Sequence, residues 1–455
     1  MTRRSRRHDT LGRGVPWHGL LVVVAVAAGL PAAAQPATPQ ALTLEGAVAR
    51  AAGANPALRA ARLETLAASA RTTQAYAKHL GDADLLASAS RYENARLVRP
   101  LWGPATPAVI GALPFDRDQL HYGLGWQIPL FAGGALIEGD RAARLAESAA
   151  RASEARAVEE LRYNVRAAYR GVLGLKHALA AAVAYEEALA HDDASARLRV
   201  ETEGWAPADA AKVTFAHESA KGRAALLAAQ LRNAKGLLAA LMGDDPAVAD
   251  YELADVDAVA VGVATTTPDL AAIAAERRTD LVAVRKTVEA QRARSAAVRA
   301  GFWPQVAFVG NYFLNDAPSV GAPIQTWELT LQLKIPLLAD VGRTFAAREA
   351  DAVAAASAER ARTKELEIES QAVDAIGRLE SARAALAAGT AQRKLGAEVV
   401  RVEELRFETG AGKVEDYLAA RSAALEGETA YWLALYSLQS AYDYVELVSG
   451  TGGRP

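Results

Sequence analysis

The stretch TGAGKVED, from Thr409 to Asp416, contains a glycine-lysine pattern like that of a phosphate-binding loop. Such a loop requires G-x-x-x-x-G-K-[ST], because the first glycine makes the turn and the hydroxyl after the lysine binds magnesium. Here Phe407 replaces the first glycine and Val414 replaces the hydroxyl. The preceding residues follow a helical period, whereas a phosphate loop follows a buried strand. We therefore reject a nucleotide hydrolase and look to the surrounding elements for the role of this stretch.

Other groups that could do chemistry are scattered. The chain has seven histidines, no cysteine, and neither an H-E-x-x-H nor a G-x-S-x-G motif. The carboxylate pairs Asp192-Asp193 and Asp244-Asp245 lie among other charges of helices or loops, a setting typical of solvated side chains. We therefore expect no enzyme, no cofactor and no metal site.

Residues 1–34 have the pattern of a signal peptide. Four arginines lie within the first seven residues, an apolar run follows from Leu20 to Leu30, and Ala32 to Ala34 form a small-residue cleavage site. We expect an exported chain without disulfides or a lipid anchor, because cysteine is absent. The formal net charge of −2 gives no electrostatic support for a nucleic-acid partner.

The rest of the chain repeats itself. IPLFAGG at Ile128 matches IPLLADV at Ile335, and the same spacing of 207 positions aligns LRVETEGWAPAD at Leu198 with LRFETGAGKVED at Leu405. An earlier segment at Pro56 matches one at Thr279. Because a fixed period indicates repeated structural units, we expect two copies of one design. They are a first repeat at 35–243 and a second at 268–450, joined by a linker at 244–267 and followed by a tail at 451–455.

Each repeat contains segments with the hydrophobic period of a strand and segments with that of a helix. LHYGLGWQIPL and TWELTLQLKIPL place apolar side chains on one face and polar ones on the other, which is typical of strands with one oily side. We expect strands at 83–92, 120–130, 304–314 and 326–337. The strands are as long as tilted membrane-spanning strands, and Trp126 and Trp327 suit a membrane interface. The period alone also allows a soluble hairpin packed on a helix.

Alanine-rich helices account for the remainder. No proline interrupts 135–202 or 342–409, each of which would form a helix of about 100 Å. Helices this long bury a stripe only by packing lengthwise on other helices. Shorter helices are expected at 42–80, 208–242, 268–302 and 414–449. Pro129, Pro304 and Pro336 lie at strand ends, so we expect them to link strands to helices.

Four membrane strands cannot close a barrel, and an open sheet edge in lipid leaves backbone groups unpaired. Several protomers must therefore pool their strands, and the helices attached to the strands would pool into a tube. Strand geometry alone does not choose between two copies and three.

The chain resembles the TolC-like outer-membrane efflux proteins of Gram-negative bacteria. The resemblance rests on N-P-x-L near Asn55, the duplicated I-P-L-[FL], and F-E-T-G-A-G-K-V-E-D-Y-L from Phe407, in this order and spacing. It implies a mainly α fold with membrane β. Four strands per protomer would join in a homotrimeric 12-stranded outer-membrane barrel, which a periplasmic α-helical barrel continues.

The implied function is a passive exit channel of a tripartite efflux or type I secretion system. Its partners would be a periplasmic adaptor, an inner-membrane pump and outer-membrane lipid. The alternative from the residues alone is a soluble periplasmic coiled-coil adaptor or scaffold. It explains the helices but not the two clearly alternating strands at equivalent positions of the two repeats.

The resemblance also assigns the helix turns to the periplasmic tip. The implied adaptor-contacting residues are Gly204, Trp205, Ala206, Gly410, Ala411, Gly412 and Lys413, and the implied periplasmic gate residues are Asp416 and Asp209. Copies of Asp416 around a pore would favour cations. Two structural alternatives stay open: Asp416 caps or charges the first turn of a helix, and Trp205 is a local packing anchor. Where family members often carry a second acidic residue, this chain has Ala419.

Overall fold

A computed structural model describes residues 41–99, 111–202, 204–248, 250–256, 266–336 and 341–452. The predicted signal peptide at 1–34 lies outside them. The first repeat comprises α1 (Leu44–Ala54), α2 (Pro56–Ala77), β1 (Asp82–Leu97), β2 (Phe115–Ala132), α4 (Ala135–Thr202) and α5 (Pro207–Met242). A short helix η1 (Pro246–Val248) follows. The second repeat comprises α6 (Thr267–Arg277), α7 (Thr279–Arg299), η2 (Ala300–Phe302), β3 (Gln305–Asp316), β4 (Ile324–Lys334), α8 (Val341–Glu408) and α9 (Val414–Ser449).

The helix expected at 42–80 is two helices that meet at Asn55. The backbone of Asn55 is extended (φ −63°, ψ 124°), and its side-chain oxygen accepts a hydrogen bond from the Leu58 amide at 3.1 Å. Since a residue before proline avoids the helical region, Pro56 forces this break and then begins α2.

The helix expected at 268–302 is also interrupted, at Arg278. Its backbone is extended (φ −67°, ψ 124°), and its guanidinium is bound by Asp280 at 2.6 Å and Gln371 of α8 at 2.6 Å. The side chain is 1% exposed. A tertiary contact therefore fixes a break that no proline marks.

The strands form one antiparallel sheet in the order β1-β2-β3-β4. Apolar side chains share one face in cross-strand rows, and one such row runs Leu85, Leu124, Tyr312, Trp327. In the next row Trp126 lies over Gly310, where a Cβ would come within 2.1 Å of the indole. The glycine thus makes room for the ring, a known way to fill the gap that glycine leaves in a sheet.

The opposite face of the sheet is polar and hydrogen-bonded across strands. His121 Nδ1 lies 2.8 Å from the Asn315 side-chain oxygen, and the Asn315 amide donates to Thr326 at 2.9 Å. The sheet is therefore apolar on one face and polar on the other, as the alternation of apolar and polar residues in the sequence predicts.

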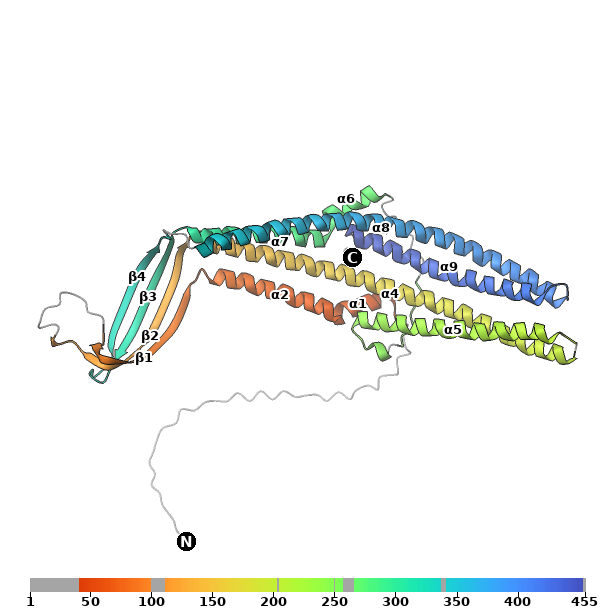
Figure 1. The fold of residues 1–455 in the computed structure, drawn as a ribbon, viewed down its shortest axis with the longest axis horizontal. Coiled ribbons are helices and arrows are strands. Elements are labelled where there is room, and N and C mark those ends of the chain that lie inside the picture. The colour runs from red at the N-terminus through yellow and green to blue at the C-terminus, as the bar shows by residue number, and fades with distance from the viewer. Residues whose placement is uncertain are drawn as a thin grey trace, which may run out of the picture. The chain divides into compact units, whose positions relative to one another are not determined.

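The helices run lengthwise from the sheet. α2 contacts α4, α4 contacts α7, and α7 contacts α8, so that these four lie in a row (Figure 1). Farther from the strands, α4 pairs with α5 and α8 pairs with α9, and their connecting turns lie at the end opposite the sheet (Figure 1). Among the described residues, no helix is long and apolar enough to cross a membrane.

Two cores hold the middle of the helices together. One combines Val165, Tyr169 and Leu173 of α4 with Leu238 and Met242 of α5. The other combines Leu270 of α6 with Leu379 of α8 and Val445 of α9. The buried Tyr169 hydroxyl also lies 2.6 Å from the Leu42 carbonyl and 2.7 Å from the Ala254 carbonyl, which ties the linker to the first repeat. Tyr436 of α9 is also part of the first core, so that core joins the two repeats.

Candidate functional site

Both helix turns reverse the chain through a left-handed glycine. Gly204 has φ +69° and Gly410 has φ +74°, a region that favours glycine. At the second turn, the amides of Ala411 and Gly412 both donate to the Arg406 carbonyl at 2.8 Å, which closes the end of α8. A Cβ on Gly412 would lie 3.1 Å from the Arg406 side chain. The two glycines of TGAGKVED thus serve a tight helix reversal.

The two turns pack on each other through a small apolar core. Ala196, Val213 and Val414 are buried there. The ring of Trp205 packs edge-on against Phe407, with centroids 5.8 Å apart, and Phe407 stacks on Tyr417 at 4.7 Å. Trp205 is half-buried, so its contacts favour the packing interpretation.

A polar network also joins the turns across the two repeats. The buried Tyr417 hydroxyl donates to Asp192 at 2.8 Å, and Arg421 binds Glu404 at 2.7 Å while its guanidinium lies 4.9 Å from the Tyr417 ring. Burial, together with the Asp192 carboxylate, raises the pKa of Tyr417, so the phenol stays protonated. Phe407 and these residues also line a cavity of about 420 Å³ between the repeats.

The two predicted gate aspartates have different surroundings. Asp209, which is half-buried, lies 2.8 Å from Lys212, and Lys212 also reaches Glu415 across the turns at 2.5 Å. The hydrogen bonds to Asp209 and Glu415 raise the pKa of Lys212. Asp416 is exposed in the first turn of α9. The helix-capping residue is Lys413, so Asp416 charges the first turn without capping it.

A groove of about 600 Å³ lies between α5 and α9 beside the turns. Small side chains such as Ala211, Ala216 and Ala419 line it, and the ring of Phe215 at its edge is 75% exposed. Lys212 and Glu415 border the groove on the side of the turns. Its alanine lining leaves room for the close approach of another helix.

The strand-to-helix junctions differ in part from expectation. Pro129 is not a linker: it lies inside β2, at a register shift between Pro129 and Phe131, because proline lacks the amide that a regular ladder needs. The link into α4 is made by Gly133 and Gly134, with φ of +64° and +92°. Pro304 immediately precedes β3. Pro336 follows β4 by two residues, and the end of the predicted strand, Leu337, lies outside the described residues.

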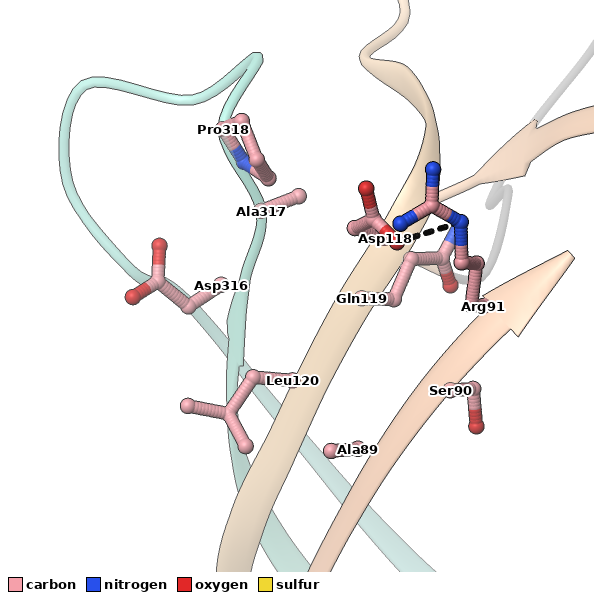
Figure 2. A pocket seen from close by; sticks show the side chains of 9 residues that line it. All are labelled: Ala89, Ser90, Arg91, Asp118, Gln119, Leu120, Asp316, Ala317 and Pro318. Atoms are coloured by element: carbon pink, nitrogen blue, oxygen red, sulfur yellow. Dashed lines mark ion pairs between the residues drawn. The ribbon is translucent and has the colours of Figure 1, made fainter.

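A separate pocket of about 580 Å³ lies where β1 meets β2, near the strand ends farthest from the helices (Figure 2). Figure 2 shows Arg91 pairing with Asp118 across the strands, at 3.6 Å, while Asp316 and Pro318 stand on the other wall. The register shifts directly after Arg91. This ion pair therefore marks the end of the first register, and the pairing resumes beyond the irregularity at Arg96 and Asp116.

Within the described ranges, no group of three or more histidine, aspartate or glutamate side chains is arranged to hold a metal ion. The chemistry that these turns offer is therefore charge, hydrogen bonding and helix packing.

Residues 270–451, from α6 to the end of α9, match the family described as outer membrane efflux protein. No curated protein matches the sequence. Several solved structures share the fold over 90% of this chain, and three of them serve as examples. A membrane protein from Pseudomonas aeruginosa is 20% identical (TM-score 0.75, 90% of that chain). The Campylobacter jejuni CmeC outer membrane channel is 15% identical (TM-score 0.78, 86% of that chain). The Vibrio cholerae outer membrane protein VceC is 16% identical (TM-score 0.74, 97% of that chain).

In the part that the structure describes, the chain is thus mainly helical with four antiparallel strands, and it shares the fold of outer-membrane channels. The expected resemblance to outer-membrane efflux proteins is confirmed by the match at 270–451 and by the shared fold, and CmeC and VceC are described as an outer membrane channel and an outer membrane protein.

Sequence reasoning found the turns but missed the network between them. Asp192 and Tyr417 lie 225 positions apart, so no local pattern joins them. One signal was present: the 207-position repeat places both turns at equivalent points, which predicts that they lie side by side. Aromatic residues at 407 and 417 within charged helices then mark the contact.

Proposed function

We propose that this chain is the outer-membrane exit channel of a tripartite efflux or type I secretion system, formed by three copies around one axis. The observation that carries the proposal is that the sheet and the row of helices end at the same two edges. One edge is β1 with α2, and the other is β4 with α8.

The sheet edges argue for closure between copies. In the described part of the chain, β1 and β4 are the outer strands of a sheet whose apolar face carries exposed Leu85, Trp327 and Leu331. An apolar face suits lipid, but open strand edges do not, because each unpaired backbone group there costs several kcal/mol. Pairing β1 of one copy with β4 of the next removes both edges.

The helix edges support the same arrangement. Leu63 and Leu66 on α2, and Phe345 and Val353 on α8, are exposed apolar side chains. These are the stripes that long helices bury against other helices. Joining α2 of one copy to α8 of the next would cover them and continue the helical row around a tube.

Three copies give twelve strands, which is the assembly that the family implies. The helix turns would then form the periplasmic end, where the groove beside Phe215 and the exposed Gly410, Ala411 and Lys413 are placed to meet an adaptor. The channel itself is passive, so the adaptor and the pump would supply the energy and select the cargo.

The assembly is tested by crosslinking in mild detergent. Because the chain has no cysteine, Leu63→Cys and Val353→Cys introduce the sole thiols, at about the same distance along α2 and α8 from the strands. We expect a short bis-maleimide to join the double variant into dimers and trimers, while each single variant stays monomeric on a denaturing gel. The detergent-corrected mass should equal three protomers.

The other outcomes identify the alternatives. Efficient crosslinking of a single variant would indicate a two-fold dimer, in which one surface meets its own copy. A monodisperse monomer that stays soluble without detergent would refute the channel and favour the periplasmic coiled-coil scaffold.

A further inference from the structure

A pocket of about 690 Å³ lies at the junction between the strands and the helices. Gly133 and Gly134, which link β2 to α4, line one part of it, and Trp303, just before β3, lines another. α7 contributes Arg292 and Arg299, which lie about two turns apart on the same side of the helix. The pocket therefore adjoins the ends of two central strands of the sheet.

The acidic side chains of this pocket are paired, whereas Arg292 is not. Asp351 of α8 accepts a hydrogen bond from Arg299 at 2.5 Å, and Glu138 of α4 lies 3.8 Å from Arg141. Arg292 is exposed and has no ion pair or hydrogen bond with another described residue. The pocket thus offers one guanidinium that is free to bind an anion.

Exposed apolar side chains surround the same pocket. The ring of Trp303 is 64% exposed, and Ile137, beside Glu138 on α4, is 67% exposed. Tryptophan is enriched where a membrane protein leaves the hydrocarbon, because its amphipathic ring sits at the level of the lipid headgroups. Arginine nearby is attracted to anionic headgroups. A tryptophan and an unpaired arginine at the strand ends therefore have the chemistry of a lipid-headgroup site.

The proposed contacts between copies leave α7 uncovered. In the row of helices α7 lies between α4 and α8, whereas the copies would meet along α2 and α8 at the two edges. The exposed ring of Trp303 therefore needs a partner other than a neighbouring copy.

We propose that this pocket binds the headgroup of an anionic phospholipid, with Arg292 on the phosphate and Trp303 against the glycerol and the first part of an acyl chain. The inference rests on the proposed function, because that function places the sheet in lipid. A headgroup with a net negative charge is favoured, since the cation of a zwitterionic headgroup competes with Arg292 for the phosphate. Charge-assisted bonds from a guanidinium to a phosphate are among the strong hydrogen bonds.

Native mass spectrometry of the full-length protein in detergent tests the proposal. The two lipids are phosphatidylglycerol and phosphatidylcholine, which share the phosphate and differ in net charge. We expect phosphatidylglycerol to bind more tightly to the wild type. Arg292→Gln should weaken this binding by about fivefold, the weight of one arginine near an anionic lipid surface, and should leave phosphatidylcholine nearly unchanged.

Three further variants separate charge, position and apolar contact. Arg294→Gln is the matched control, because Arg294 is also an exposed arginine of α7 but lines a different pocket with Arg71 of α2. It should keep the wild-type preference. Arg292→Lys retains the charge and should keep most of the affinity. Trp303→Ser should weaken both lipids alike, because the ring contacts the part that they share.

An excess of inorganic phosphate distinguishes a lipid site from a phosphate site. It should not displace phosphatidylglycerol, since the free ion lacks the contact with Trp303. Displacement would show that the pocket takes phosphate without lipid and would overturn the proposal.

Two other results would also overturn it: equal affinity of the wild type for both lipids, or equal effects of Arg292→Gln and Arg294→Gln. If Arg292→Gln does not assemble, the wild-type preference and Arg292→Lys still decide. A detergent-dependent trimer without lipid preference would refute this inference and leave the channel standing. A protein that needs no detergent and binds neither lipid would refute both.

Discussion

At the scale of single residues, Arg278 shows how one buried charge can organise two helices. Its guanidinium binds Asp280, which is largely buried, and Gln371 of α8. In Arg278→Leu, we expect Asp280 to keep only the more distant Arg156, 4.0 Å away, as an ion-pair partner, so the cost should fall below the roughly 3–5 kcal/mol of a fully uncompensated buried charge. The measurement is the melting temperature in detergent. Arg278→Lys should recover part of the loss, and a leucine variant as stable as wild type would contradict this account.

The same pair predicts a response to acid. Burial acts to raise the pKa of Asp280, but hydrogen bonding and the charge of Arg278 lower it below its usual value. A lowered pKa means stability that is present above the ordinary value, about pH 4, and is lost as pH falls through the folded value. Acid unfolding of Asp280→Asn should therefore be less steep below about pH 4 than that of wild type. If Asp280→Asn and the wild type unfolded equally steeply with acid, the ion pair of Arg278 with Asp280 would not contribute to the pH dependence of stability.

These residues also mark how far sequence reasoning reaches. The break at Asn55 could have been predicted, because Asn-Pro is a local stop signal. The break at Arg278 could not, since its guanidinium is held by Gln371, 93 positions away. In the same way, glycines located the turns, whereas the contact between Asp192 and Tyr417 requires both repeats to be folded.

At the scale of elements, the pair α8–α9 depends on glycine at its contact. A Cβ on Gly427 would lie 2.9 Å from the carbonyl carbon of Gln392, and backbone cannot move aside cheaply. We expect Gly427→Ala to push the helices apart, at a cost of about 1–3 kcal/mol. Gly377→Ala is the matched control. Nothing lies within 4 Å of that Cβ, so a gain of about 0.5–1 kcal/mol is expected in the helix.

Thermal unfolding of both alanine variants measures this difference. The melting temperature should fall for Gly427→Ala and hold or rise for Gly377→Ala. If both fell equally, helix approach at Gly427 would not be the cause. The periods of 2 and 3.6 predicted where strands and helices lie, and the mainly helical fold with antiparallel strands is confirmed.

At the scale of the whole molecule, the proposed trimer would repeat each turn three times around one axis. Asp416 is exposed, whereas Asp209, its equivalent in the first repeat, is paired with Lys212 at 2.8 Å. Ala419 stands where the first repeat has Lys212. The second turn thus has no lysine at this position and has Lys413 at its helix cap instead, so we expect the exposed Asp416 carboxylate to be balanced less closely than Asp209. Three such carboxylates near a narrow entrance would favour cations.

Single-channel recording in a planar bilayer tests this difference between the turns. We expect Asp416→Ala to reduce the cation preference, measured as the reversal potential in a salt gradient, and to raise or equalise anion passage. Asp209→Ala should change it less, because that charge is already balanced by Lys212. Low salt should enlarge the contrast, since screening weakens a ring of exposed charges. Equal effects of the two variants would place the controlling charge elsewhere on the tunnel wall, and unchanged selectivity in both would remove the charge ring from the proposed mechanism.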